Sequence, residues 1–181
     1  MTRSLVYLGP EGTFTHQAAR ALAPDGVKLV AMDTLEDVLD ALRSGEADWA
    51  VAAHTSAAGL IAPTQAALEA GWAEAHARHA IKVSFDLYRR PCDPSALTGL
   101  YGHEKALAQV RDYVNANGLQ TCAVASNTAG LVRVSADPTP GWGAVGPPGL
   151  AEQYGLEVSA KALEGQRSHE TGFVLLARRP S

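Results

Sequence analysis

The feature that most constrains the fold is the alternation of short apolar segments with amphipathic ones along most of the 181 residues. Residues 4–8 and 28–32 have the length and apolar character of buried strands. Between Thr34 and Gly45, apolar residues recur at i, i+3, i+4 and i+7, which predicts an amphipathic helix that Thr34 caps and that ends near Gly45.

The second half of the chain repeats this alternation. Residues 79–88 alternate well enough to predict one long strand, and residues 104–116 predict a helix that Asn117-Gly118 ends. The other expected strands span 49–53, 97–101, 120–125, 142–145, 157–163 and 171–177, and the other expected helices follow Thr13 or Thr15 and span 60–70, 128–134 and 149–154. This order of elements predicts an α/β fold with largely parallel sheets.

Composition excludes several classes of protein. Hydrophobic residues make up 46% and charged residues 19%, and the net charge of -4 argues against a nucleic-acid binder. We expect no membrane segment, since no apolar run approaches the roughly 20 residues that span a bilayer. Cys92 and Cys122 lack metal-like spacing, and two reduced thiols are preferred over a disulfide. We therefore expect a cytoplasmic protein with neither metal nor cofactor.

Four segments are placed to bind a ligand. Residues 9–14, 53–59, 102–104 and 125–128 each follow an expected strand and are small, polar or glycine-bearing. In open α/β sheets, ligands bind beyond the carboxyl ends of strands, next to helix N-termini. This pattern favours a small, anionic ligand.

One long motif suggests a family. Residues 7–19 read Tyr-Leu-Gly-Pro-Glu-Gly-Thr-Phe-Thr-His-Gln-Ala-Ala, which resembles the N-terminal signature of prephenate dehydratases nearly letter for letter. Looser matches to that family follow in the family's order at 45–48, Ser56 and Gly59, 101–109, 127–130, 153–156 and 171–173. The similarity covers the whole chain.

The resemblance implies a two-lobed α/β fold of the periplasmic-binding-protein type (type II), with the active site in a cleft between the lobes. Lobe 1 is expected over about 1–77 plus 161–181, and lobe 2 over about 78–160. Family members often carry a C-terminal ACT domain that senses phenylalanine, for which we expect no room after the last strand. Members usually form homodimers or tetramers, so we expect the same here.

The chemistry that the resemblance implies is decarboxylating dehydration. Prephenate loses its ring carboxylate as carbon dioxide and its C4 hydroxyl as water, which yields phenylpyruvate for phenylalanine biosynthesis. The enzyme must hold a dianion and protonate the leaving hydroxyl. In the family, the threonine of Thr-Arg-Phe donates this proton and the asparagine of Glu-Asn-Ser assists, which assigns catalytic roles to Thr171 and Thr55. The same motifs imply substrate contacts for Gly9, Pro10, Glu11, Gly12, Thr13, Phe14, Ser56, His103, Asn127, Thr128, His169 and Phe173.

Several ligand-facing positions depart from the family pattern. Gly172 stands in place of the motif arginine, and His54-Thr55 in place of Glu-Asn. The other departures are Ala52-Ala53 for Pro-Ile, Gly102 and Glu104 for serine and proline, and Asn127 for serine. The scaffold motifs are kept, so this pattern suggests an altered task.

The sharpest new feature is His54, and a second histidine, His169, lies near the last motif. His54 lies at the end of an expected strand, where it is either a general acid or base near neutral pH or a hydrogen-bonded residue without chemistry. His169 with Arg167 either supplies the positive charge lost with the motif arginine or belongs to a solvent-facing loop.

Three functions remain open. The leading hypothesis is a prephenate dehydratase-like lyase acting on prephenate or a close cyclic acid. The first alternative is a repurposed relative in specialised metabolism, either a non-aromatising prephenate decarboxylase, against which the retained Thr171 weighs, or an enzyme for another ring acid. The second is a non-catalytic protein that binds a small acid. Convergence of His54, Thr55 and Thr171 on one pocket would favour an enzyme, and scattered positions the binding protein.

Overall fold

The chain folds into two compact units. The computed structural model describes residues 3–91, 93, 95–137, 139–165 and 169–179. Unit 1 runs to Val83 and resumes at His169, whereas unit 2 is the continuous stretch between them. The first division falls after the boundary expected near 77, because the strand Ala73–Val83 belongs wholly to unit 1. The second falls after the boundary expected near 160, because the amides of Ala162 and Leu163 donate to Asp86 and Phe85 of unit 2.

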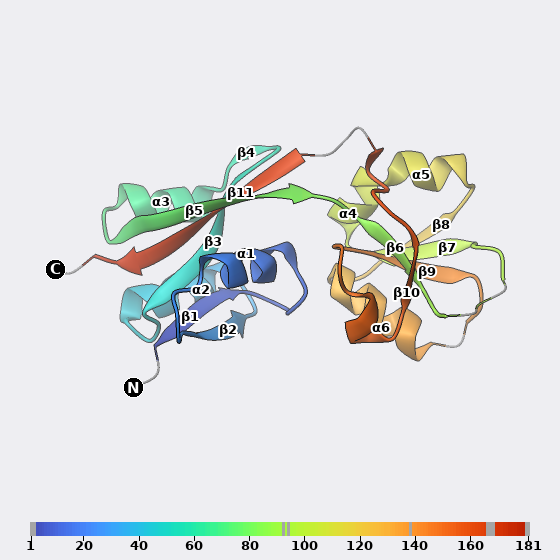
Figure 1. Cartoon of the computed structure of the whole chain (residues 1–181). Helices are drawn as coiled ribbons and strands as arrows, with labels where there is room; N and C mark the ends of the chain where they lie inside the picture. The colour runs from blue at the N-terminus through green and yellow to red at the C-terminus, as the bar shows by residue number, and fades with distance from the viewer. Residues whose placement is uncertain (1–2, 92, 94, 138, 166–168, 180–181) are drawn as a thin grey trace. The chain divides into compact units, whose positions relative to one another are not determined.

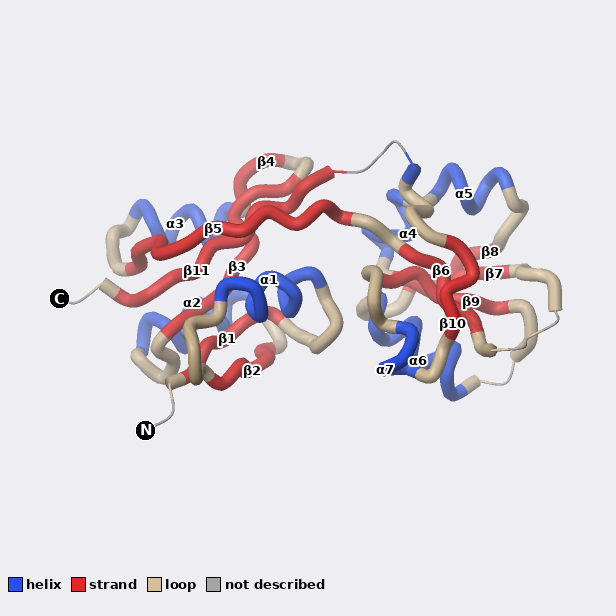
Figure 2. The backbone as a smooth tube through the Cα atoms, in the orientation of Figure 1, coloured by secondary structure: helices blue, strands red, loops and turns tan. Residues whose placement is uncertain are grey.

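Unit 1 is a mixed sheet covered by helices (Figures 1 and 2). Its elements are β1 (Ser4–Leu8), α1 (Phe14–Leu22), β2 (Lys28–Met32), α2 (Leu35–Ser44), β3 (Trp49–Ser56), β4 (Gly59–Leu60), α3 (Ala62–Glu69), β5 (Ala73–Val83) and β11 (His169–Arg178). The strand order is β2-β1-β3-β11-β5, with β4 paired to β3. β11 thus lies between two strands from the first half of the chain.

Local signals set the bounds of the helices in unit 1. The Thr34 side chain accepts a hydrogen bond from the Asp37 amide at the start of α2, and Gly45 ends that helix with a φ of 84°. Of the two candidate caps for α1, Thr13 is the one used, since its hydroxyl accepts from the His16 amide at 3.2 Å. Both helices therefore begin at a threonine cap that the sequence predicts.

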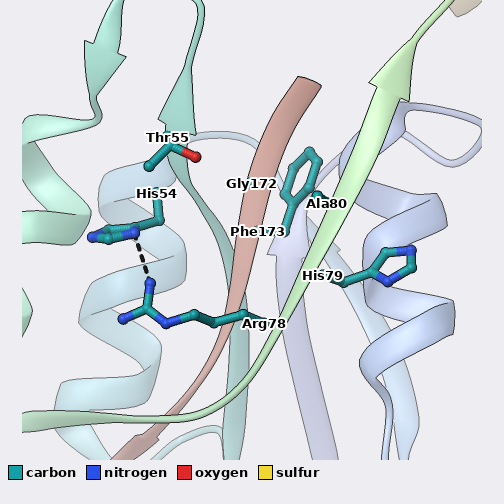
Figure 3. Close-up of a pocket in the computed structure, with 7 residues that line it drawn as sticks. All are labelled: His54, Thr55, Arg78, His79, Ala80, Gly172 and Phe173. Atoms are coloured by element: carbon teal, nitrogen blue, oxygen red, sulfur yellow. Dashed lines mark hydrogen bonds between the residues drawn. The ribbon is translucent and has the colours of Figure 1, made fainter. Parts of the chain in front are cut away.

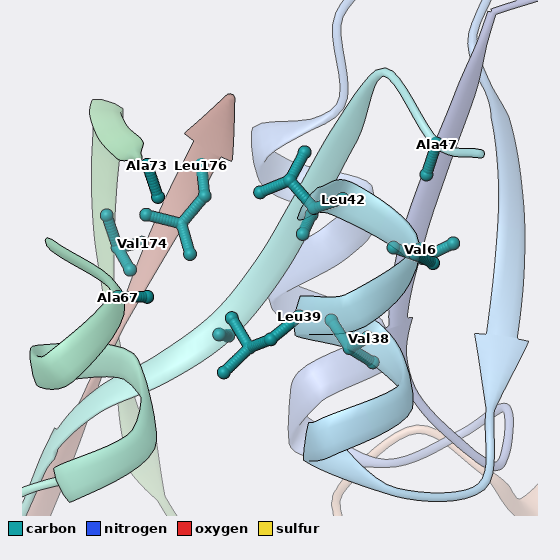
Figure 4. Packing of buried hydrophobic residues seen from close by; sticks show 12 residues of the cluster. Val6, Val38, Leu39, Leu42, Ala47, Ala67, Ala73, Val174 and Leu176 are labelled. Carbon is teal, nitrogen blue, oxygen red and sulfur yellow. The ribbon is translucent and has the colours of Figure 1, made fainter. Parts of the chain in front are cut away.

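The sheet of unit 1 has two buried faces. One face packs against α2 and α3, and its core contains Val38 and Leu42 from α2 with Val174 and Leu176 from β11 (Figure 4). The opposite face packs against α1, and there Phe173 and Leu175 of β11 join Ala18. Because successive side chains of a strand point to opposite faces, β11 contributes to both cores.

Unit 2 repeats the helix-covered sheet on a smaller scale (Figure 1). Its elements are β6 (Asp86–Arg89), β7 (Gly99–Gly102), α4 (Glu104–Gln109), α5 (Arg111–Ala116), β8 (Gln120–Ala123), α6 (Asn127–Ala136), β9 (Trp142–Gly146), α7 (Ala151–Tyr154) and β10 (Glu157–Ala160). The strand order is β10-β6-β9-β7-β8. Tyr88 and Leu131 are fully buried in its core.

The expectation of largely parallel sheets is wrong. β1 pairs in parallel with β2 and β3, and β7 with β8 and β9, but β11 runs antiparallel to both of its neighbours. In unit 2, β6 is antiparallel to β9 and β10. Each sheet is therefore a parallel three-stranded core extended by antiparallel strands.

Two element predictions also need correction. The single strand expected over 79–88 is two strands in different sheets, because β5 pairs with β11 whereas β6 pairs with β9 and β10. The helix expected over 104–116 is divided at Val110 into α4 and α5. Among the described residues, no helix is long and apolar enough to cross a membrane.

Candidate functional site

The topology of unit 1 gathers distant motifs at one sheet edge. β1 and β3 are parallel, and β11 runs antiparallel to β3 and β5. The carboxyl ends of β1, β3 and β5 therefore meet the amino end of β11. This arrangement brings residues 54–56 and 169–173 to one edge, together with the loop at 9–14.

A pocket of about 320 Å³ opens at this edge (Figure 3). It is lined by His54, Thr55, Arg78, His79, Ala80, Gly172 and Phe173. Three of the predicted site residues, namely His54, Thr55 and Phe173, therefore border one cavity.

A directed chain of hydrogen bonds runs from the pocket into α3. Arg78 Nη1 lies 2.9 Å from His54 Nδ1, and His54 Nε2 lies 2.8 Å from Gln65 Oε1. The Gln65 amide then donates to Glu69 Oε1 at 2.8 Å. A guanidinium can only donate, so His54 Nδ1 accepts and its proton is on Nε2. Both ring nitrogens are engaged, which favours the hydrogen-bonded role for His54 over the acid–base role.

The missing motif arginine is linked to Thr55. Gly172 pairs with Thr55 across the β3–β11 ladder, next to a register shift. A Cβ atom at position 172 would overlap the Thr55 Oγ1 atom. A side chain at 172 would therefore require Thr55 to move.

Thr171 lies on the face of the sheet opposite to Arg78 and Ala80, which is the face that the pocket residue Phe173 shares. It pairs with Ile81, and both Ile81 and the alternate residue Phe173 pack in the core beneath α1. Thr171 is half-buried, and its hydroxyl bonds to no other residue in the described part of the chain. Thr171 is not among the residues that line the pocket. Thr171 thus does not converge with His54 and Thr55 on one cavity.

The loop at 9–14 uses part of its polar surface internally. The Gly9 amide donates to the Met32 carbonyl at 2.9 Å, and the Gly12 amide to His16 Nδ1 at 3.0 Å. The Thr13 hydroxyl donates to the Pro10 carbonyl at 3.0 Å. Two of the amides expected to face a ligand are therefore already occupied.

His16 is the titratable group behind this loop. Its ring stacks on Tyr7 with a centroid distance of 5.2 Å. Burial lowers the pKa of His16 below its usual 6.5, an effect that nearby Glu11 opposes and Arg20 reinforces. A lower pKa keeps the ring neutral, as required to accept the hydrogen bond from Gly12.

The predicted residues of unit 2 form a cluster of their own. Asn127 Oδ1 accepts from the His103 amide at 2.8 Å, and His103 Nδ1 accepts from the Lys105 amide at 3.2 Å. The Ser126 hydroxyl caps α6 by accepting from the Ala129 amide, and it lies 2.9 Å from the Thr128 hydroxyl. The bond between Asn127 and His103 connects the loops after β7 and β8, whereas the others are local to one loop or helix start. Ser126 was not among the predicted site residues, although a serine before an expected helix is a cap signal.

Two further predicted residues, Ser56 and His169, lie on β3 and β11. Ser56 accepts from the Ala58 amide at 3.2 Å inside the turn that joins β3 to β4. His169 begins β11 opposite Val83, while Arg167, its expected partner, lies outside the described residues. The described residues contain no group of three or more histidine, cysteine or acidic side chains that could hold a metal ion.

Two residues that hydrogen-bond to His54 were not predicted from the sequence. Arg78 and Gln65 are distant from His54 in sequence, and nothing local to either marks it as a partner. The alternation of β5 places Arg78 on the same face as Ala80, but only the pairing of β5 through β11 brings that face beside β3.

Comparisons with known proteins agree with this fold. A family model described as prephenate dehydratase matches residues 5–181. The prephenate dehydratase of Amycolatopsis methanolica is 36% identical over 180 residues, which cover 97% of this chain and 58% of that protein. This chain therefore spans about three fifths of the length of that relative.

Solved structures align over nearly the whole chain, which confirms the predicted α/β fold class. Prephenate dehydratase from Arthrobacter aurescens, in complex with L-Phe, aligns with a TM-score of 0.81 and 26% identity over 98% of this chain and 60% of that chain. A structure described as GqqA, a quorum-quenching acylase, aligns with a TM-score of 0.80 and 24% identity over 99% of this chain and 65% of that chain. The second likeness is one of fold alone.

Proposed function

Because the chain belongs to the prephenate dehydratase family, we propose that it is a lyase that removes carbon dioxide and water from prephenate or a close cyclic acid. The observation that carries this proposal is the family match over residues 5–181 together with Thr171, the retained threonine of the Thr-Arg-Phe motif. The product from prephenate would be phenylpyruvate, a precursor of phenylalanine.

Thr171 is the proposed proton donor. Its hydroxyl is available, since no described residue bonds to it, and its face of the sheet carries the apolar side chains of Ile81 and Phe173. The bond to the ring carboxylate breaks and its electron pair enters the ring as the C4–O bond breaks. The departing hydroxide takes the Thr171 proton and leaves as water.

The loop before α1 is the proposed carboxylate site on that face. The amides of Glu11 and Thr13 donate to no other described residue, and α1 begins directly after Thr13. Backbone amides at a helix N-terminus favour an anion. We assign no proton transfer to His54, because both of its ring nitrogens are bonded within unit 1.

A second candidate is a protein that binds a small acid without transforming it. The observation in its favour is the separation of Thr171 from the pocket that His54 and Thr55 line. A repurposed lyase, which decarboxylates without aromatisation or acts on another ring acid, is a variant of the first candidate.

The deciding experiment is incubation of the purified protein with prephenate, followed by absorbance and mass detection of products. Phenylpyruvate above the spontaneous rate of a protein-free control would support the dehydratase. Release of carbon dioxide without phenylpyruvate would identify a decarboxylase. Binding of prephenate without turnover would favour the second candidate.

A further inference from the structure

The pocket of unit 1 contains a cation with unused hydrogen-bond donors. Arg78 is exposed on β5, and a single hydrogen bond, from Nη1 to His54, is recorded for its guanidinium among the described residues. A guanidinium has five N–H donors. The others remain available at the wall of the pocket (Figure 3).

The guanidinium is held by a relay anchored on α3. His54 accepts from Arg78 and donates to Gln65, which donates to Glu69 one helical turn further on. Every bond of this relay points the same way, so the terminal carboxylate of Glu69 orients the whole set. Such preorganisation reduces the entropy lost when a ligand binds.

The space beside Arg78 is open because the neighbouring positions are small. Ala80 follows Arg78 on the same face of β5 and pairs with Gly172 of β11. The resulting cavity of about 320 Å³ lies at the lower end of the range for small-molecule sites.

We propose that Arg78 is the anion receptor of this pocket and binds the carboxylate of a small cyclic acid, with His54 as its positioning residue. A planar guanidinium suits a carboxylate because two parallel N–H groups can bind both oxygens. The inference rests on the proposed function for the identity of the acid only, and not for the existence of the anion site.

Calorimetric titration with phenylpyruvate and with its methyl ester tests the receptor without requiring turnover. The wild-type protein should bind the acid about tenfold more tightly than the ester, and Arg78→Gln should remove this preference. Arg78→Lys should keep part of it, since the charge remains but the paired geometry is lost. Lys82→Gln is the matched control, because Lys82 is an exposed cation on the same strand that does not line the pocket, and its preference should equal that of wild type.

Non-additivity tests the positioning role of His54. His54→Phe should lower the affinity for the acid severalfold in the wild-type background but not in the Arg78→Gln background. A merely structural effect of the substitution would appear in both backgrounds. Three outcomes would each refute the proposed role of Arg78. They are equal affinity of the wild-type protein for acid and ester, no binding of phenylpyruvate, and an unchanged preference for the acid in Arg78→Gln. Arg78-dependent binding without consumption of prephenate would instead uphold the site and refute the lyase.

Discussion

The two units use the same architectural position in opposite ways. In unit 2, the polar groups after β7 and β8 bond to one another, so that Asn127 connects the two loops and Ser126 pairs with Thr128 within the second. In unit 1, the relay from Glu69 ends at a guanidinium with unused donors, and the Thr171 hydroxyl has no partner among the described residues. Satisfied polar groups stabilise a fold, whereas groups left open are available for a ligand. The motif positions of unit 1 are therefore better candidates for chemistry than those of unit 2.

A pair of matched substitutions would test this difference most strongly. Thr171→Val removes the proposed proton donor, so turnover of prephenate should fall at least about 100-fold while the free energy of unfolding changes little. Thr128→Val removes a buried hydroxyl that lies 2.9 Å from Ser126, so it should destabilise the fold by about 1 kcal/mol with little effect on turnover. Steady-state assays and urea unfolding measure the two effects.

The reverse result would break the contrast between the units. If Thr128→Val abolished turnover in a folded protein, or if Thr171→Val left the rate intact, the open hydroxyl of unit 1 would not be the catalytic one. Circular dichroism of both variants provides the folding control.

The space around Gly172 offers a smaller test. Gly172→Ala places a Cβ against the Thr55 hydroxyl and should lower the free energy of unfolding by about 1 kcal/mol. Thr55→Ala removes that hydroxyl, so the double variant should recover most of the loss. Urea unfolding of the two single variants and the double variant measures the coupling, and strictly additive losses would contradict the contact.

The smallest expected effect concerns pH. Because burial lowers the pKa of His16 below 6.5, the unfolded chain takes up a proton first, and unit 1 should lose stability as the pH falls below 6.5. Burial raises the pKa of Asp86 in unit 2 above 3.8. The pH dependence of its contribution to folding stability therefore has the opposite sign, and that contribution is lost as the pH rises through the raised pKa.

Urea unfolding between pH 7.5 and 5 would measure the first of these effects. The difference between wild type and His16→Gln should shrink as the pH falls, because the variant lacks the titrating ring. A constant difference across this range would show that His16 does not control the acid response.

Local signals in the sequence predicted individual elements of the fold well. The helix from Thr34 to Gly45 has the predicted cap and end, and β1 and β2 have the predicted bounds. The pairing of strands was harder to predict, because β11 comes from the far end of the chain and its antiparallel place between β3 and β5 leaves no local trace. The single strand expected over 79–88 failed for the same reason, since its two parts have different distant partners.

Part of the lining of the pocket was predictable where a motif marked it. The resemblance pointed to His54, Thr55 and Phe173, which border one pocket. Arg78 was missed because an arginine on an amphipathic strand has the pattern of a solvated residue. Its hydrogen-bond partner is a histidine 24 residues away, and only the assembled sheet brings the two together.

The central place of β11 also has a consequence for synthesis on the ribosome. Unit 2 is continuous in sequence and can fold as soon as it emerges, but the sheet of unit 1 stays open between β3 and β5 until residues 169–178 have been made. Until then the nascent chain exposes two unpaired strand edges, which are hazards for aggregation. The same late strand supplies Thr171 and Gly172, so the candidate site would be completed only when that hazard is removed.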